Sequence, residues 1–351
     1  MKPVALVTGL SGVVGATAAP LLASSFEVVA LIGRRTLDAG CEQVPVDLRA
    51  PRLGLDARTF SLLAERADVV VHMAGNVNYA ATPEELHAVN VGGAGEMTAL
   101  AEAAGCPLVF VSTAFAERYR QASREAEVGS LTHARPSAYH RSKAEADARV
   151  RACAQPWSIV RPSIVMGDSG DGSMPQPQNV HRMVSLLAGG PAAMFGHPDH
   201  RVDMVPRDYV ARTVHRLALD AVDGRPLPRE FWATAGPAAL TMRQWSEAIG
   251  QFLARAGRPV PKPEQLDPFT VRVSDYPGWE QLSRGMRRGM ATLYVSTLAL
   301  AAEPFPTSFT HADRSPERLG DDHALARSLF DNDLAWLLRE SRATWAVRPV
   351  G

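Results

Sequence analysis

The fold is decided by the stretch Val7-Thr8-Gly9-Leu10-Ser11-Gly12-Val13-Val14-Gly15, which joins an apolar run to a helical pattern. Its glycines permit a tight turn and let the backbone come close to a diphosphate. The N-terminus of the following helix presents free N–H groups and a favourable dipole to such an anion. The spacing is Gly-x-x-Gly-x-x-Gly rather than the commoner Gly-x-Gly-x-x-Gly. The stretch therefore predicts a dinucleotide-binding βαβ unit.

The same alternation of strand and helix continues through the first 165 residues. Expected strands are Val4–Val7, Val28–Ile32, Gln43–Val46, Val69–His72, Leu108–Val111 and Ser158–Val160. Expected helices are Val13–Ala23, Arg58–Arg66, Glu84–Ala103 and Ser137–Ala152. Short β-branched runs alternating with longer amphipathic ones indicate parallel strands with crossover helices. The fold class predicted is α/β, with a doubly wound Rossmann-type parallel sheet.

After Pro162 the pattern changes to a Gly/Pro-rich loop at 167–178, followed by mainly helical patterns. A capping box at Thr241–Gln244 opens one helix, and an apolar stretch lies at Met290–Ala302. We expect a dinucleotide-binding domain at 1–165, to which the chain returns around 201–236. Residues 166–200 and 237–351 are expected to form a smaller, mainly helical substrate-binding region.

Composition excludes some classes of function. Lys+Arg and Asp+Glu are 37 each in 351 residues, so no net charge attracts nucleic acid. The three cysteines fit neither a zinc site nor a disulfide framework, and we expect no metal and a cytoplasmic location. The histidines of His197-Pro-Asp-His200 indicate a polar loop. Neither a signal peptide nor an apolar run of about 18 residues is apparent, so no transmembrane segment is expected. Nothing indicates the oligomeric state.

The residues after the second and third expected strands bear on the cofactor. NAD-binding proteins usually place an acid after the second strand to hold the ribose hydroxyls. Here Arg34 and Arg35 follow it, and two guanidiniums can bind a 2′-phosphate. This favours NADPH, although Asp38 lies nearby. Asp47, after the third strand, is positioned to hydrogen-bond the adenine amine.

A second motif carries the chemistry. Tyr139 and Lys143 are four residues apart, on one face of an expected helix. The chain has only three lysines, at positions 2, 143 and 262, so a chance pairing is improbable. Thr113 ends the fifth expected strand, where ligands bind in open α/β sheets. Tyr139 can protonate a carbonyl oxygen that accepts hydride, Lys143 can stabilise the phenolate, and Thr113 can orient the carbonyl.

An ordered series of motifs resembles the extended short-chain dehydrogenase/reductase family over about residues 3–235. It comprises Thr8-Gly9-x-x-Gly12-x-x-Gly15, Asp47-Leu48, His72-Met-Ala-Gly75, Asn90-Val91, Ser112-Thr113-Ala114, Tyr139-x-x-x-Lys143 and Arg161-Pro162-Ser163. The resemblance implies that Thr113, Tyr139 and Lys143 are catalytic. Candidate cofactor-binding residues are then Thr8, Gly9, Ser11, Gly12, Val13, Gly15, Arg34, Arg35, Asp47, Leu48, Ala74, Gly75, Lys143, Pro162, Ser163 and Val165. Candidate substrate-binding residues are Asn78, Phe115 and Met166.

Longer phrases are similar to a narrower branch, the thioester reductase domains and fatty acyl-CoA reductases of the male-sterility group. These phrases are Ser112–Phe115, Arg161–Ser169 and Asp203–Val210. The branch implies NADPH-dependent reduction of an acyl thioester, on CoA or a carrier protein, to an aldehyde or alcohol. Phe115-Ala-Glu-Arg departs from the small polar residues common after the catalytic threonine. The alternatives are a ketone or hydroxysteroid-type dehydrogenase and a nucleotide-sugar epimerase or dehydratase. A cofactor-sensing regulator would typically lack the Tyr–Lys pair.

Overall fold

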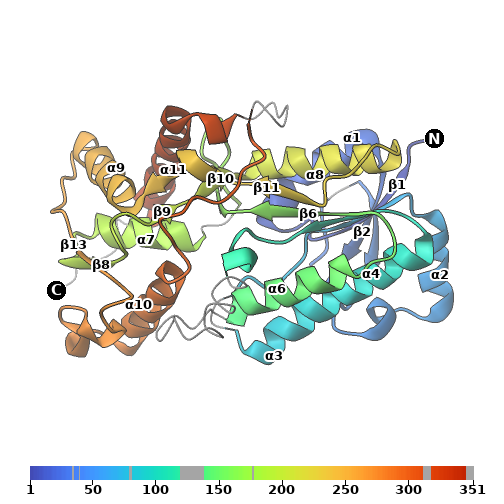
Figure 1. Cartoon of the computed structure of the whole chain (residues 1–351), viewed down its shortest axis with the longest axis horizontal. Helices are drawn as coiled ribbons and strands as arrows, with labels where there is room; N and C mark the ends of the chain where they lie inside the picture. Colours follow the sequence, from blue (N-terminus) through green and yellow to red (C-terminus); the bar gives the residue numbers. More distant parts are fainter. Residues whose placement is uncertain are drawn as a thin grey trace. The chain divides into compact units, whose positions relative to one another are not determined.

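The computed structural model describes residues 1–33, 35–38, 40–78, 81–118, 138–175, 178–310 and 318–344. The chain divides into two compact units (Figure 1). The first unit contains Met1–Pro162 and Asp208–Ala233, and the second contains Ser163–Arg207 and Thr234–Gly351. Each unit is built from two segments, so the chain crosses between them three times.

The first unit is organised by a seven-stranded sheet with the order β11-β6-β5-β4-β1-β2-β3. Its strands are β1 (Val4–Thr8), β2 (Glu27–Ile32), β3 (Glu42–Pro45), β4 (Val69–His72), β5 (Leu108–Val111), β6 (Trp157–Pro162) and β11 (Glu230–Ala233). Every neighbouring pair is parallel. Strands buried on both faces need continuous apolar runs, and Val69-Val-Val71 and Leu108–Val111 are runs of this kind.

Helices cover both faces of this sheet. They are α1 (Val13–Ser25), α2 (Ala57–Arg66), α3 (Pro83–Leu86), α4 (Gly93–Ala104), α6 (Ala138–Arg151) and α8 (Arg207–Val222). Figure 1 shows α1 and α8 on one face and α2, α4 and α6 on the other. The predicted doubly wound fold is confirmed. The chain leaves β1 toward β2 and β3, then returns to β4 on the other side of β1. Ligands bind at such a reversal, beyond the carboxyl ends of the strands.

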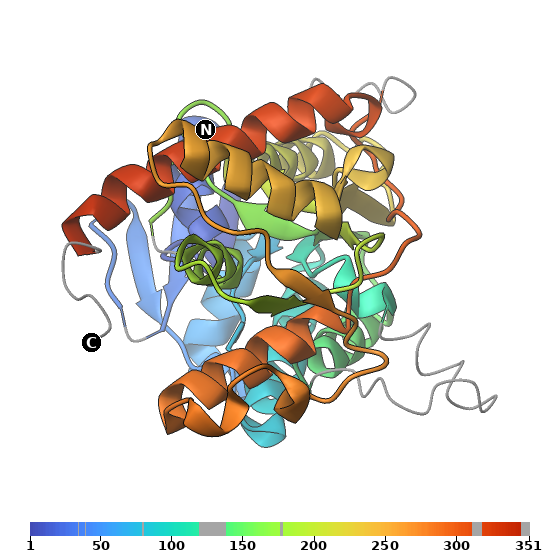
Figure 2. The same ribbon diagram turned by 90° about the vertical axis from the view of Figure 1, so that its left-hand side faces the viewer.

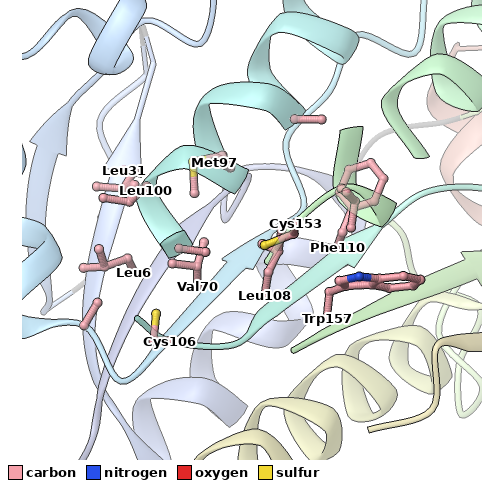
Figure 3. Close-up of a cluster of buried hydrophobic side chains, with 14 of the residues drawn as sticks. Leu6, Leu31, Val70, Met97, Leu100, Cys106, Leu108, Phe110, Cys153 and Trp157 are labelled. Atoms are coloured by element: carbon pink, nitrogen blue, oxygen red, sulfur yellow. The ribbon is translucent and has the colours of Figure 1, made fainter. Parts of the chain in front are cut away.

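The core of the first unit lies between the sheet and the helices of one face. Figure 3 shows side chains from the sheet and from α4 gathered there, including Leu6, Val70, Met97 and Leu100. All four are fully buried. Burying a side chain of this size contributes about 1.5–3 kcal/mol, which makes the sheet a rigid base for residues at its carboxyl edge.

The second unit consists of short strand pairs and helices. Its strands are β7 (Ile164–Met166) paired with β10 (Met204–Pro206), β9 (Arg201–Val202) with β12 (Leu240–Thr241), and β8 (Ala193–Phe195) with β13 (Glu264–Leu266). Its helices are α7 (Asn179–Ala188), α9 (Met242–Arg255), α10 (Arg284–Thr297) and α11 (His323–Thr344). Figure 2 shows two of them packed together, the red α11 beside the amber α9.

The loop after β7 is fixed to α11 by buried polar contacts. Asp333 accepts hydrogen bonds from the Gly167 backbone N–H at 2.8 Å and from Nε2 of His181 at 3.1 Å. His181 Nδ1 accepts from the Gln178 N–H, so its remaining proton is on Nε2. Gly172 packs so closely on α11 that a Cβ there would lie 2.2 Å from the Asn332 carbonyl oxygen. The C-terminal helix therefore sets the path of this glycine-rich loop.

Several elements differ from the expectation. The helix expected at Glu84–Ala103 is interrupted by a π-helical turn at His87–Gly92. The seventh strand, β11, was not predicted, because Glu230–Ala233 is short and gains its place only by pairing with β6. The apolar stretch Met290–Ala302 is helical only as far as Thr297. The capping box at Thr241 is present, with Gln244 as its partner. Among the helices that the structure describes, none is long and apolar enough to cross a membrane.

Candidate active site

The glycine-rich turn is shaped to receive a ligand closely. Gly9 has a φ of +82°, and a Cβ there would lie 2.5 Å from the Ala74 nitrogen. A Cβ on Gly15 would lie 2.0 Å from the Gly9 carbonyl oxygen. Gly12 caps α1 without a side-chain acceptor, and the first turn of this helix holds no acid. Only glycine fits at positions 9 and 15, and the first-turn N–H groups suit a diphosphate. Ser11 is exposed on the turn, and Val13 begins the helix.

Thr8 and the residues after β4 are tied together behind this turn. The Thr8 hydroxyl lies 2.7 Å from His72 Nδ1 and accepts from the Ala74 N–H at 3.3 Å. Burial, and then the charge of Lys143, lower the pKa of His72 to about 3. A neutral histidine is the form that can accept the Thr8 proton. Thr8 is itself buried, and its hydroxyl helps to fix the position of Ala74.

The residues expected around the adenosine lie at the ends of β2 and β3. Arg35 is exposed, whereas Arg34 lies outside the described residues. Asp47 is held by Arg49, whose Nε and a terminal nitrogen donate to its two oxygens at 2.9 and 2.8 Å. Leu48 packs on the core of the first unit, against Gly93. The Asp47 carboxylate is half-exposed.

Lys143 lies where three parts of the first unit meet: the loop after β4 that contains Gly75, the end of β5, and α6. Its Nζ donates to the Val111 carbonyl oxygen at 3.1 Å, and it lies 4.7 Å above the centre of the Phe110 ring. A Cβ on Gly75 would lie 4.0 Å from Nζ, so the lysine and the loop after β4 are neighbours. Burial lowers the pKa of Lys143 to about 8, opposed by the charge of Asp147 and reinforced by that of Arg161.

Tyr139 lies one turn before Lys143 on α6. Burial, and then the negative charge of Asp147, raise the pKa of its phenol above the ordinary value. The phenol is therefore protonated at neutral pH and able to donate. Its ring meets that of His140 edge-on, with ring centres 5.4 Å apart. His140 in turn stacks on Phe115 at 5.7 Å, which links Tyr139 to a candidate substrate-binding side chain.

Thr113 is buried just beyond β5. Its hydroxyl donates to the Pro162 carbonyl oxygen and accepts from the Phe115 N–H, both at 3.3 Å. These distances are long for hydrogen bonds of a hydroxyl, so the proton can be redirected to a substrate oxygen at little cost. The structure thus places Thr113 at the carboxyl edge of the sheet as expected from its position in the chain.

Asn90, which the motif series contained without a role, joins two parts of the site. Its side-chain oxygen accepts from the Asn76 N–H at 2.7 Å. Its amide nitrogen donates to the Asn76 carbonyl oxygen and to Oγ of Ser142, at 3.0 and 2.9 Å. It fixes the loop after β4 to the helix that carries Tyr139 and Lys143. In the sequence, Asn90 is a polar residue within the apolar stretch Ala88–Val91. This position was the signal that could have identified it as a buried side chain with a structural role.

A buried ion pair close to Lys143 and Tyr139 was not predicted from the sequence. Arg161 on β6 and Asp147 on α6 are fully buried, and Arg161 Nη1 lies 2.9 Å from Asp147 Oδ2. Arg161 also forms hydrogen bonds to Glu230 on β11 at 3.0 and 3.1 Å. Burial raises the pKa of Glu230, but hydrogen bonds from Arg161 and Arg151 outweigh this and lower it to about 2. Sequence alone does not pair residues so far apart.

The remaining candidates are distributed between the units. Asn78 is exposed in the loop after β4. Ser163, Val165 and Met166 belong to the second unit, where Ser163 and Met166 are buried and Val165 pairs with Val205. Within the part of the chain that the structure describes, no three His, Cys, Asp or Glu side chains gather as a metal site would require.

Comparison with known proteins decides the family. The model of the male sterility protein family matches residues 22–214, more than half of the chain. The chain belongs to this family. It is an NAD(P)-binding oxidoreductase of the short-chain dehydrogenase/reductase type, and the expected branch is confirmed.

Curated relatives of this male-sterility family member are much longer chains. A linear gramicidin synthase chain of Brevibacillus parabrevis is 31% identical over 189 residues, which are 50% of this chain and 4% of that protein. Glycine betaine reductase of Emericella nidulans is 39% identical over 94 residues, 24% of this chain and 7% of that protein. The matched stretches therefore cover less than a tenth of the length of these relatives.

Solved structures share the fold of this family member. The terminal R domain of the myxalamid PKS-NRPS pathway has a TM-score of 0.71 at 20% identity, covering 97% of this chain and 92% of that one. A thiolation-reductase di-domain of an archaeal non-ribosomal peptide synthetase has a TM-score of 0.62 at 17% identity, covering 99% and 77%. Bordetella bronchiseptica WbmH, solved with NAD+, scores 0.61 at 17% identity, covering 97% and 99%.

Proposed function

We propose that the chain is an NADPH-dependent reductase of acyl thioesters carried by CoA or a carrier protein. The observation that carries the proposal is the position of Lys143. Its ammonium lies against both the Gly75 loop and the end of β5, one helical turn from Tyr139. A carbonyl reductase needs a proton donor and a cation at this edge of the sheet.

The glycine-rich turn fits a dinucleotide diphosphate, and the residues around it would hold the rest of the cofactor. Arg34 and Arg35 would bind the 2′-phosphate, Asp47 the adenine, and Lys143 the ribose beside the nicotinamide. Further contacts would come from Thr8, Ser11, Val13, Leu48, Ala74, Gly75, Pro162, Ser163 and Val165. Reduced nicotinamide supplies a hydride when bound.

The chain's own residues would handle the proton and the substrate. Thr113 would orient the thioester carbonyl by redirecting its hydroxyl proton from Pro162. Tyr139 would donate its proton to the oxygen on which negative charge develops, and Lys143 would stabilise the phenolate left behind. The resulting hemithioacetal separates into an aldehyde and a thiol without a further reductant. Asn78, Phe115 and Met166 would contact the acyl part.

Two observations favour a thioester over a free ketone as substrate. They are membership of the male sterility protein family and the structural similarity to domains of peptide and polyketide synthetases. The neighbours are the terminal R domain of the myxalamid PKS-NRPS pathway and a thiolation-reductase di-domain, and a thiolation partner would present its acyl group as a thioester. The glycine-rich loop at 167–175, fixed by Asp333, and the helices of the second unit would accommodate a pantetheine arm.

The test supplies an acyl-CoA, the matching acyl-pantetheine and a panel of ketones with NADPH. Thiol release and aldehyde are followed by mass spectrometry. We expect one thiol released for each NADPH consumed in forming an aldehyde. Oxidation of NADPH by a ketone with no thiol released from any thioester would overturn the substrate class and retain the oxidoreductase. Lys143→Met is expected to lower both turnover and cofactor affinity.

A further inference from the structure

Three consecutive residues at the end of β5 are each held by a different buried charged side chain. The Val111 carbonyl oxygen accepts from Lys143 Nζ at 3.1 Å. The Ser112 hydroxyl donates to Asp147 Oδ1 at 2.5 Å. The Thr113 carbonyl oxygen accepts from Arg161 Nη1 at 3.3 Å. These contacts tie the segment that carries the candidate catalytic hydroxyl to three charged groups.

The same three charged groups are linked to one another. Lys143 and Asp147 are one turn apart on α6, and Arg161 on β6 forms an ion pair with Asp147. Arg161 is also hydrogen-bonded to Glu230 and lies 5.3 Å from the centre of the Trp232 ring, both on β11. One connected set of contacts therefore fixes α6, β5, β6 and β11 relative to each other.

Stability alone is a poor reason to bury such a pair. Removing two charges from water costs several kcal/mol each, and apolar residues of similar size often stabilise a core equally well. Polar contacts differ from apolar ones in being directional, so they specify the position of the groups they join. Here the directional contacts are made to Ser112 and Thr113, which lie at the carboxyl edge of the sheet.

We propose that Asp147 and Arg161 are positioning residues that hold Thr113 in register with the helix bearing Tyr139 and Lys143. This inference rests on the proposed function of those three side chains. Asp147 on α6 accepts a hydrogen bond from Ser112, the residue before Thr113. Arg161 on the neighbouring strand donates to the carbonyl oxygen of Thr113 itself. Neither side chain is exposed, so neither contacts substrate.

The pair also surrounds Lys143 with opposite charges. Among the described residues, the titratable groups that act on Lys143 are Asp147 on the same helix, Arg161 on β6 and His72 on β4, and Tyr139 lies one turn before it. Asp147 raises the pKa of Lys143 and Arg161 lowers it. His72, with a pKa of about 3, is neutral near pH 8, and so is Tyr139. The two fixed charges thus act on Lys143 in opposite directions.

The experiment titrates Lys143 directly, because the chain has only three lysines. The protein is produced with lysine carrying 13C at the ε carbon, and Lys2→Arg and Lys262→Arg assign the three signals. The pKa of Lys143 is followed by NMR without cofactor or substrate. In Asp147→Asn we expect it to fall by about one unit, and in Arg161→Gln to rise by about as much. Glu145→Gln, on the same helix, serves as the control and should leave it unchanged.

Shifts of the Lys143 pKa in opposite directions in the two variants would show that Asp147 and Arg161 act through fixed positions and charges. A general loosening of the core would act differently. A loosened core admits water to Lys143 and raises its pKa in both variants, which would overturn the proposal.

If either single variant does not fold, as judged by circular dichroism, Ser112→Ala is measured instead. This variant retains both charges but loses the link to Asp147, and we expect kcat to fall about tenfold with the Kd for NADPH unchanged. A wild-type kcat in Ser112→Ala would refute the proposal. The NMR outcome does not depend on which carbonyl is reduced, so it is independent of the substrate class.

Discussion

The Thr8 hydroxyl and His72 Nδ1 share a hydrogen bond of 2.7 Å, which joins the carboxyl ends of β1 and β4. The Ala74 N–H donates to the same hydroxyl oxygen at 3.3 Å. Burial, and then the charge of Lys143, lower the pKa of His72 to about 3, so the ring is neutral at neutral pH. Both side chains are buried at the reversal point of the sheet, so the position of Ala74 depends on an uncharged histidine.

Acid should destabilise the protein through this histidine. The folded pKa of His72 is about 3 and the unfolded value about 6.5, so the unfolded chain binds the proton first. The stability that the neutral ring contributes is complete above pH 6.5 and is lost as the pH falls toward 3. We expect a loss of about 2 kcal/mol from this residue between about pH 7 and 5, measured by urea unfolding. His72→Gln should remove that part of the loss; an identical pH dependence in the variant would contradict this assignment.

Gly9→Ala should abolish cofactor binding and destabilise the first unit. The added Cβ would lie 2.5 Å from the Ala74 nitrogen, at a φ of +82° that an L-residue adopts only with strain. Calorimetry with NADPH and thermal unfolding measure the two effects. The control is Gly95→Ala on α4, where a Cβ meets nothing within 4 Å and alanine favours the helix. Equal losses of NADPH affinity and thermal stability in the two variants would show that the turn does not require glycine at position 9.

Tyr139→Phe should reduce turnover by about a hundredfold or more, as expected for loss of a general acid. The ring and its edge contact with His140 remain, so NADPH should bind with unchanged affinity. Steady-state kinetics with the preferred substrate and a fluorescence titration of NADPH give the two values. Tyr209→Phe on α8 is the matched control and should be fully active. Near wild-type turnover of Tyr139→Phe would mean that another group donates the proton.

Replacing Arg34 and Arg35 together with Ala should weaken NADPH binding by a few kcal/mol, since each charge-assisted hydrogen bond contributes roughly 1.5–3 kcal/mol. NADH binding should hardly change, because NADH lacks the 2′-phosphate. Dissociation constants of both cofactors for the wild type and the variant test this. Arg66→Ala controls for general loss of positive charge, since Arg66 pairs with Glu27 and Glu42 on the surface. A wild type that binds both cofactors equally would disprove the selectivity.

Asp333→Ala should destabilise the second unit by about 2–3 kcal/mol, because buried donors on Gly167 and His181 lose their acceptor. Asp331→Ala, two residues earlier on the same helix, removes only part-exposed ion pairs with Arg327 and Arg255 and should cost no more than about 1 kcal/mol. Chemical unfolding of both variants makes the comparison. Similar costs at the two positions would show that α11 does not fix the glycine-rich loop.

Local patterns in the sequence determined most of the first unit. The glycines at 9, 12 and 15, the apolar runs and the four-residue spacing of Tyr139 and Lys143 act over one turn or one strand. Such signals need no knowledge of distant residues. The strands β1, β4 and β5 and the start of α1 accordingly lie within a residue of their expected places.

Only the tertiary structure decided which distant residues meet. Arg161 and Asp147 are 14 positions apart in the chain, Asn90 and Ser142 are 52 apart, and Gly167 and Asp333 are 166 apart. Each pair forms only when sheet order and helix docking bring its members together. The stretch Glu230–Ala233 likewise becomes a strand because β6 offers it an unpaired edge. The sequence alone thus determined the chemistry at each position, whereas the contacts that orient those groups arise from the packing of elements far apart in the chain.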